Sequence, residues 1–291
     1  LKHTFTEIAQ RMTNDEMITL AKFLAISGII LPMLPHKNLI PDINLTPYSI
    51  WLATVVVSGI SYLSYLLKRY VFHESGTLVS GIIGGLYSST ATISVLARKS
   101  RKASEQEATD YVAAMLLAVS MMFLRFMILI LIFSREIFLS IYPYLLTMAG
   151  GAGIFCWGFP SPQKRPEDQS AETEEDDSSN PLEFKVALIF AVLFVIFTFL
   201  THYTLVYAGT GGLNLLSFVS GFSDITPFIL NLLQNTGSVA ALIITACSMQ
   251  AIISNIMVNM FYALFFAGKG SKLRPWILGG FGVVIVCNLV L

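Results

Sequence analysis

Long apolar runs separated by short polar segments dominate the chain. A membrane-spanning helix needs about 20 mostly apolar residues. Seven runs meet this length or come close to it: 17–35, 48–67, 109–133, 138–158, 184–207, 238–267 and 273–291. We predict a transmembrane helix for each of them, and therefore an all-α polytopic membrane protein with about seven transmembrane helices.

Two further runs, 77–97 and 210–233, are long enough to cross a membrane but differ in composition. Both are rich in Gly, Ser and Thr, and the second contains Pro227. Irregular backbone at membrane depth is tolerated only where protein or a water-filled cavity surrounds it. We therefore predict that both segments are broken helices inside the protein.

Short motifs recur in the same order in the two halves of the chain. The match includes LVSG at 78–81 with FVSG at 218–221, and AAMLLAVSMM at 113–122 with AALIITACSM at 240–249. The motif GGAG at 150–153 also has a counterpart, GGFG at 279–282. Several matches in register predict an internal duplication. The repeated unit consists of a helix, a broken segment and two further helices. Segment 17–35 is then an extra leading helix.

Hydrophilic segments mark the domain boundaries. Residues 161–180 hold seven acidic residues and no large apolar one, which predicts a disordered tether rather than a cation-sensing tail. The chain begins with Leu1 and not Met, so we expect a fragment or a processed product. We predict a cytoplasmic lead-in, a first membrane half, an acidic linker and a second membrane half, at residues 1–16, 17–158, 159–182 and 183–291.

The distribution of Lys and Arg predicts the topology. If all nine segments cross, these residues split almost evenly between the two sides and no positive-inside bias remains. If both broken segments are re-entrant, only Lys37 and Arg135 lie on one side. The other side then holds thirteen: Lys2, Arg11, Lys68, Arg69, Arg98, Lys99, Arg101, Lys102, Lys164, Arg165, Lys269, Lys272 and Arg274. We predict two re-entrant segments, a cytoplasmic N-terminus and an inverted repeat, as in many secondary transporters.

Composition excludes several other classes of protein. Hydrophobic residues make up 55% of the 291 residues and charged residues only 12%, which is roughly half the charge of a soluble domain. The 18 Lys and Arg balance the 18 Asp and Glu, so no basic stripe is left for nucleic acid. The chain contains no GxSxG, HExxH, Walker A, Rossmann or CxxC motif. We expect no enzyme, no cofactor and no nucleic-acid partner.

Polar residues within the predicted membrane segments form the candidate ion-binding site. A carboxylate at bilayer depth costs about 2.5 kcal/mol or more and normally faces a cavity or a partner. Asp224 is therefore the best candidate ligand for a cation, a metal or a proton. Arg125 is the other strongly charged residue at depth, and it is the natural gate or ion-pair partner. Hydroxyls and amides complete the predicted set: Ser88, Ser89, Thr90, Thr92, Thr226, Asn255 and Asn259.

Each of these candidates also has a structural interpretation. Hydroxyls pack helices and bond to carbonyls of the preceding turn. Asn255 and Asn259 are four residues apart, share a helix face and could simply join helices. Asp224 and Arg125 could form a structural ion pair. The functional interpretation predicts that the two broken segments meet near mid-membrane, where Ser88–Thr92 and Asp224 line one polar cavity with Asn255 or Asn259 on its wall.

The stretch GGLYSSTATISVLARKSRK at 84–102, with PMLP at 32–35 and GFSDITPF at 221–228, carries a family resemblance. It resembles the uncharacterised membrane domain found C-terminal to the MgtC/SapB-like domain in long MgtC-type bacterial proteins. The SSTAT run at 88–92 is the most specific part. Two positions depart from the family pattern: Thr226 stands where a second Asp is frequent, and Asn259 where a Lys is frequent.

The resemblance implies a prokaryotic inner membrane and a leading MgtC-like domain absent from this chain. Two functions remain open. One is a secondary transporter or channel for a small ion, such as magnesium or another divalent cation, or a proton-coupled substrate. The other is a non-transporting MgtC-like regulator that acts through protein contacts. Asp224 suits a cation or proton, whereas Arg125 with helix N-termini suits an anion. The expected partners are the lipid bilayer and a small ion, and a homo-oligomer remains open.

Overall fold

The computed structural model describes residues 14–41, 43–71, 76–101, 103, 105–157, 184–235, 239–268 and 273–290. Most of the predicted lead-in and the acidic linker lie outside these residues. Within them, the secondary structure is helical, and the only β-type pairing is a single bridge between Ile40 and Ile43. The structure therefore confirms the predicted all-α class.

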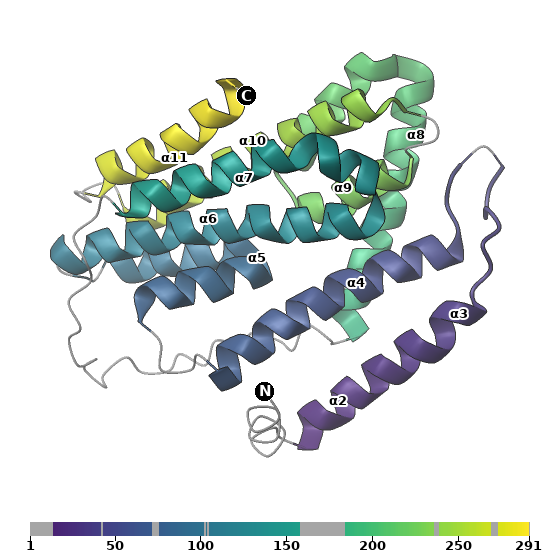
Figure 1. The fold of residues 1–291 in the computed structure, drawn as a ribbon, viewed down its shortest axis with the longest axis horizontal. Coiled ribbons are helices and arrows are strands. Elements are labelled where there is room, and N and C mark those ends of the chain that lie inside the picture. Colours follow the sequence, from purple (N-terminus) through teal and green to yellow (C-terminus); the bar gives the residue numbers. More distant parts are fainter. Residues whose placement is uncertain are drawn as a thin grey trace.

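The chain runs through a series of helices that Figure 1 shows packed side by side. In order, they are α2 (Asn14–Ala25), the π-helical η1 (Ile26–Ile30), α3 (Leu31–Met33), α4 (Pro47–Leu66), the π-helical η2 (Leu67–Val71), α5 (Thr77–Ser100), α6 (Glu105–Phe133), α7 (Arg135–Trp157), α8 (Phe184–Ser220), α9 (Ile225–Gln234), α10 (Ala241–Ala267) and α11 (Arg274–Val290).

Six helical stretches among the described residues are long and apolar enough to cross a membrane: 16–33, 47–66, 77–100, 109–133, 186–220 and 241–267. Their outward faces carry large apolar side chains, such as Val206 and Tyr207, which are 62% and 83% exposed. Apolar surface on this scale belongs in lipid rather than in water. These six stretches differ from the seven predicted crossings. They include 77–100, which was predicted as a broken segment, and they do not include α7 or α11, which correspond to the predicted crossings 138–158 and 273–291.

Helix α5 is broken at Ser88, whose backbone is extended at φ −156° and ψ 105°. A Cβ atom added to Gly84 would lie 2.4 Å from Oγ1 of Thr92. Eight residues of straight helix would separate the two positions by about 12 Å along the axis. The chain therefore doubles back at Ser88, and residues 77–100 form what we call the first hairpin.

Helix α8 is broken at Gly209, whose φ of 60° lies in the left-handed region that favours glycine. A Cβ atom on Gly212 would lie 2.8 Å from Cγ2 of Thr204, so here too the chain reverses. Residues 210–220 then lead into a turn at 221–224, and α9 follows. The ring of Phe228 in α9 packs edge-on against Phe197 of α8 at 5.6 Å. We call residues 210–234 the second hairpin.

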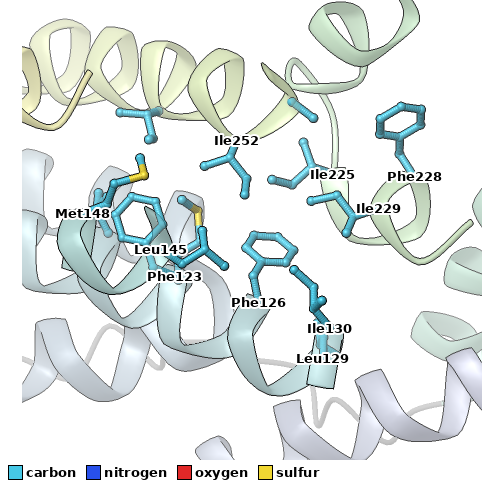
Figure 2. Packing of buried hydrophobic residues seen from close by; sticks show 14 of the residues in the cluster. Phe123, Phe126, Leu129, Ile130, Leu145, Met148, Ile225, Phe228, Ile229 and Ile252 are labelled. Carbon is cyan, nitrogen blue, oxygen red and sulfur yellow. The ribbon is translucent and has the colours of Figure 1, made fainter. Parts of the chain in front are cut away.

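Helix α6 lies at the centre of the packing and makes close contact with the first hairpin. Added Cβ atoms on Gly81 and Gly85 would fall 2.3 Å from the carbonyl oxygen of Ala114 and 2.5 Å from Cα of Ala118. Glycine is needed at both positions because the two backbones touch. Figure 2 shows a second contact of α6, in which Phe126 points toward α9 and α10.

The leading helix α2 lies beside α4, at the edge of the molecule (Figure 1). Its Glu16 is buried and forms an ion pair with Arg69 of η2 at 2.9 Å. The hydroxyls of Tyr65 and Tyr70 donate hydrogen bonds to the same carboxylate. Burial, followed by the hydrogen bond to Glu16, raises the pKa of Tyr70 to about 12. This cluster fastens the leading helix to the end of α4.

Candidate functional site

The tips of the two hairpins line one cavity of about 490 Å³. Its walls come from both hairpins and from α4, α6, α8 and α10. Seven of the nine residues predicted for the site line it: Ser88, Ser89, Thr90, Arg125, Asp224, Thr226 and Asn255. Thr92 and Asn259 do not.

The hairpins enter this region from opposite ends of α4. The first begins shortly after η2, which continues from the end of α4. The second ends beside the start of α4, where the side chain of Gln234 donates to the carbonyl of Ser49 at 3.4 Å and Asn44 donates to the carbonyl of Gln234 at 2.6 Å. The 20 residues of α4 span about 30 Å. The two hairpins therefore approach the cavity tip to tip.

At the first tip, a charged side chain caps the arm that enters the cavity. The guanidinium of Arg125, on α6, donates to the carbonyl of Tyr87 at 2.9 Å. Its Nε is buried without a hydrogen-bond partner. The outgoing arm begins at Ser89, and its first residues line the cavity. The Ala91 amide donates to Oγ of Ser88 over a long distance, 3.4 Å.

At the second tip, neutral side chains from α10 cap the incoming arm. The amide of Asn255 donates to the carbonyl of Gly221 at 3.2 Å, and the hydroxyl of Ser254 donates to the carbonyl of Phe218 at 2.6 Å. The outgoing arm, α9, begins with Asp224 as its N-cap, whose carboxylate accepts from the Thr226 amide at 2.9 Å. The carboxylate thereby satisfies one of the free amides at the start of α9.

Arg125 and Asp224 face the same cavity without forming an ion pair. Arg125 is bonded to the carbonyl of Tyr87, and Asp224 is bonded to the α9 backbone. The cavity therefore contains one positive and one negative side chain, each held by a different hairpin tip.

The two predicted site residues outside the cavity have other positions. Thr92 packs against Gly84 inside the first hairpin. Asn259 is fully buried on α10 and donates to Oδ1 of Asn255 at 3.2 Å, so it orients a residue that does line the cavity. The shared helix face predicted for the two asparagines is seen in this contact.

Sequence reasoning missed the contribution of α4. Ser58 and Ser61 line the cavity from this helix. Together with Thr54 they occupy its buried face at spacings of four and three residues. Such a hydroxyl stripe in an otherwise apolar helix was the available signal. Tyr87 and Tyr262 also line the cavity.

The site offers few ligands to a metal ion. No group of three or more His, Cys, Asp and Glu side chains lies together in the described part of the chain. A divalent cation at Asp224, the predicted metal ligand, would depend mainly on hydroxyl, amide and backbone oxygens. Such ligands without further carboxylates bind a hard cation weakly.

The fold and this cavity together define a polytopic helical membrane protein with a polar cavity between two broken helices. The chain belongs to the family described as "Domain of unknown function (DUF4010)", which matches residues 55–267. This range includes both hairpins, α6 and α10. The chain is also 25% identical over 226 residues to an "Uncharacterized protein" of Aquifex aeolicus (strain VF5), an alignment that covers 76% of this chain and 95% of that protein. No solved structure matches the chain.

Proposed function

We propose that the protein is a secondary transporter or channel for a small ion, which passes through the cavity between the two hairpin tips. The observation that carries this proposal is the meeting of two broken helices, one from each half of the chain, at a cavity that contains Arg125 and Asp224. Broken helices at mid-membrane binding sites recur in secondary transporters, because their free backbone groups replace the water around an ion.

The proposed architecture has seven crossings, two re-entrant hairpins and an inverted repeat. Its support is the shared construction of the hairpins. Gly81 and Gly221, the last residues of the matching LVSG and FVSG motifs, each press against a residue 33 positions later, Ala114 and Ser254. In each half, a polar side chain of the next helix also donates to the carbonyl end of the incoming arm.

The proposed orientation places the N-terminus in the cytoplasm of a prokaryote, with the protein in the inner membrane. Arg98 near the end of the first hairpin lies over the ring of Phe266, and Arg101 lies beside Gly268. The end of α5, which carries Arg98 and Lys99 in its last turn, therefore lies beside the end of α10. This agrees with one positively charged side facing the cytoplasm. A leading MgtC-like domain is part of the same proposal.

Ion flux into proteoliposomes tests the proposed transport. Purified protein should move at least one small inorganic or carboxylate ion down an imposed gradient. Ser58→Phe should stop this flux, since Ser58 lines the cavity and a phenyl ring there would fill it. Ser140→Phe is the matched control, because Ser140 lies on the exposed surface of α7. Wild-type protein that is folded but moves none of the tested ions would favour the regulator instead.

Cysteine accessibility tests the proposed topology. In a chain without its native cysteines, single cysteines at Gly76 and Ala103 should both be protected from an impermeant reagent added outside intact cells. A cysteine at Lys37 should react. Labelling of Ala103→Cys but not Gly76→Cys would show that α5 crosses the membrane, and the re-entrant proposal would fail.

A further inference from the structure

At both tips, side chains of the neighbouring helices donate to the carbonyl ends of the incoming arms. Each tip joins a helix end that exposes carbonyls to a helix start that exposes amides. The carbonyls of Tyr87, Phe218 and Gly221 already accept from Arg125, Ser254 and Asn255. The residues that begin the outgoing arms, among them Ser89, Thr90 and Ile225, line the cavity. In the first turn of α9 the Thr226 amide donates to Asp224 and Pro227 has no N–H, so Ile225 carries the remaining amide.

The charge balance of the cavity follows from this arrangement. Arg125 and Asp224 offset each other. Each helix start adds roughly +0.5 of an elementary charge, and each opposing carbonyl end roughly −0.5. The charges at the two tips therefore balance, and an anion would be held by directed hydrogen-bond donors rather than by net charge.

Arg125 supplies the observation that is independent of the helix starts. Its guanidinium reaches the cavity from α6, uses one nitrogen on the carbonyl of Tyr87 and keeps a buried Nε without a partner. A buried guanidinium with unused donors is strongly disfavoured unless an acceptor completes its hydrogen bonds. Asp224 does not do so, because the two residues form no ion pair and the Asp224 carboxylate caps α9.

We propose that the cavity binds a small anion, held by Arg125 and by the first turns of the two outgoing arms, and that the carboxylate of Asp224 weakens this binding by repulsion. The proposal rests on the proposed function only in using the same cavity, and it names the substrate class as a small inorganic or carboxylate anion. Planar oxyanions match the fork of donors on a guanidinium.

Two substitutions give opposite results for an anion site and a cation site. Asp224→Asn keeps the cap on α9, because Asn and Asp are similar N-cap residues. It should tighten binding of nitrate or formate about tenfold by removing a like charge that lines the same cavity. Arg125→Gln keeps an amide donor near Tyr87 but loses the charge, and it should weaken the same binding about tenfold or more. Glu136→Gln and Arg135→Gln, both at the exposed start of α7, should change neither value.

Calorimetric titration of the full chain in detergent measures these effects. The probes are the sodium salts of nitrate, formate and phosphate, with potassium and magnesium gluconate as the cation probes at equal ionic strength. If wild-type protein binds no anion, or if Asp224→Asn abolishes binding of magnesium or potassium, the inference is wrong. If Arg125→Gln does not fold, the direction of the Asp224→Asn effect still decides. Anion binding without any flux would refute the proposed transport but not the anion site. Flux of a cation would refute the anion site but not the proposed transport.

Discussion

The two hairpins each bring an incoming and an outgoing arm to the cavity, but they carry different charges. At the first tip, a guanidinium from α6 caps the incoming arm, and uncharged hydroxyls begin the outgoing one. At the second tip, amide and hydroxyl groups from α10 cap the incoming arm, and a carboxylate begins the outgoing one. The difference teaches that close packing and carbonyl capping are common to both hairpins, whereas the charges are not and differ between the two tips.

The largest expected effect is on the close helix contacts that both hairpins share. Gly81→Ala and Gly85→Ala should each lower the stability of the protein by about 1–3 kcal/mol, because the new methyl group would press on main-chain atoms of α6. Gly221→Ala should have a similar effect through Ser254. Thermal unfolding in detergent measures this. Gly150→Ala is the control, since nothing lies within 4 Å of its added Cβ. Equal stability of all four variants would contradict the packing described above.

A smaller difference should separate the two carbonyl caps. Arg125→Met leaves the part-buried carbonyl of Tyr87 without its charged donor, which costs about 2–3 kcal/mol. Asn255→Leu removes a neutral donor from Gly221 and costs about 1 kcal/mol. Asn259 also loses its acceptor in the second variant. The measurement is again the thermal midpoint, with Arg135→Met as the surface control. A larger loss of stability from Asn255→Leu would contradict the expectation that the charged cap contributes more than the neutral one.

A double-mutant cycle tests the reversal at Ser88 directly. Gly84→Ala should destabilise the first hairpin by crowding Thr92, and Thr92→Ala should restore part of the loss because it removes the two nearest atoms. We expect a coupling of about 0.5–2 kcal/mol. Thr92→Ala combined with Gly150→Ala should show none. Additive effects of Gly84→Ala and Thr92→Ala would mean that the two residues do not meet and that α5 runs straight.

The smallest expected effect is on the starts of the outgoing arms. Asp224→Ala should cost about 1 kcal/mol through the lost N-cap, and Asp224→Asn only a few tenths. Ser88→Ala should cost less than Asp224→Ala, because its contact with the Ala91 amide is 3.4 Å long. These values come from the same thermal scans. A loss from Ser88→Ala equal to that from Asp224→Ala would show that both tips depend on an N-cap.

The sequence was most informative where composition alone implies a broken helix. The Gly and hydroxyl content of 77–97 and 210–233 predicted irregular backbone, and the structure has breaks at Ser88 and at 221–224. The ion-binding roles of the predicted residues stay predictions. Thr92 could not be placed from sequence because reversal of the chain turns it toward Gly84, which no helical periodicity describes. The hydrogen bond from Arg125 to the Tyr87 carbonyl could not be predicted from the sequence either, because every residue carries the same backbone carbonyl.

The matching glycine motifs also differ in what they do. Gly81 and Gly221 of the LVSG and FVSG motifs are both in tight contact with the next helix. In contrast, Gly150, Gly151 and Gly282 have open space around them. The sequence match at LVSG and FVSG therefore identified a shared close contact, whereas Gly150, Gly151 and Gly282 of the GGAG and GGFG motifs make no such contact.

The contact between α5 and α10 has a consequence for how the protein is made. The ends of these helices meet at Arg98 and Phe266, and the tips they support share a cavity. The ribosome releases residue 100 well before residue 267, and at about 5–20 residues per second the delay is on the order of ten seconds or more. During that time the first hairpin can pack on α6 but lacks its contact with α10. Slowing synthesis within the acidic linker should prolong this exposed stage and increase degradation of the newly made chain.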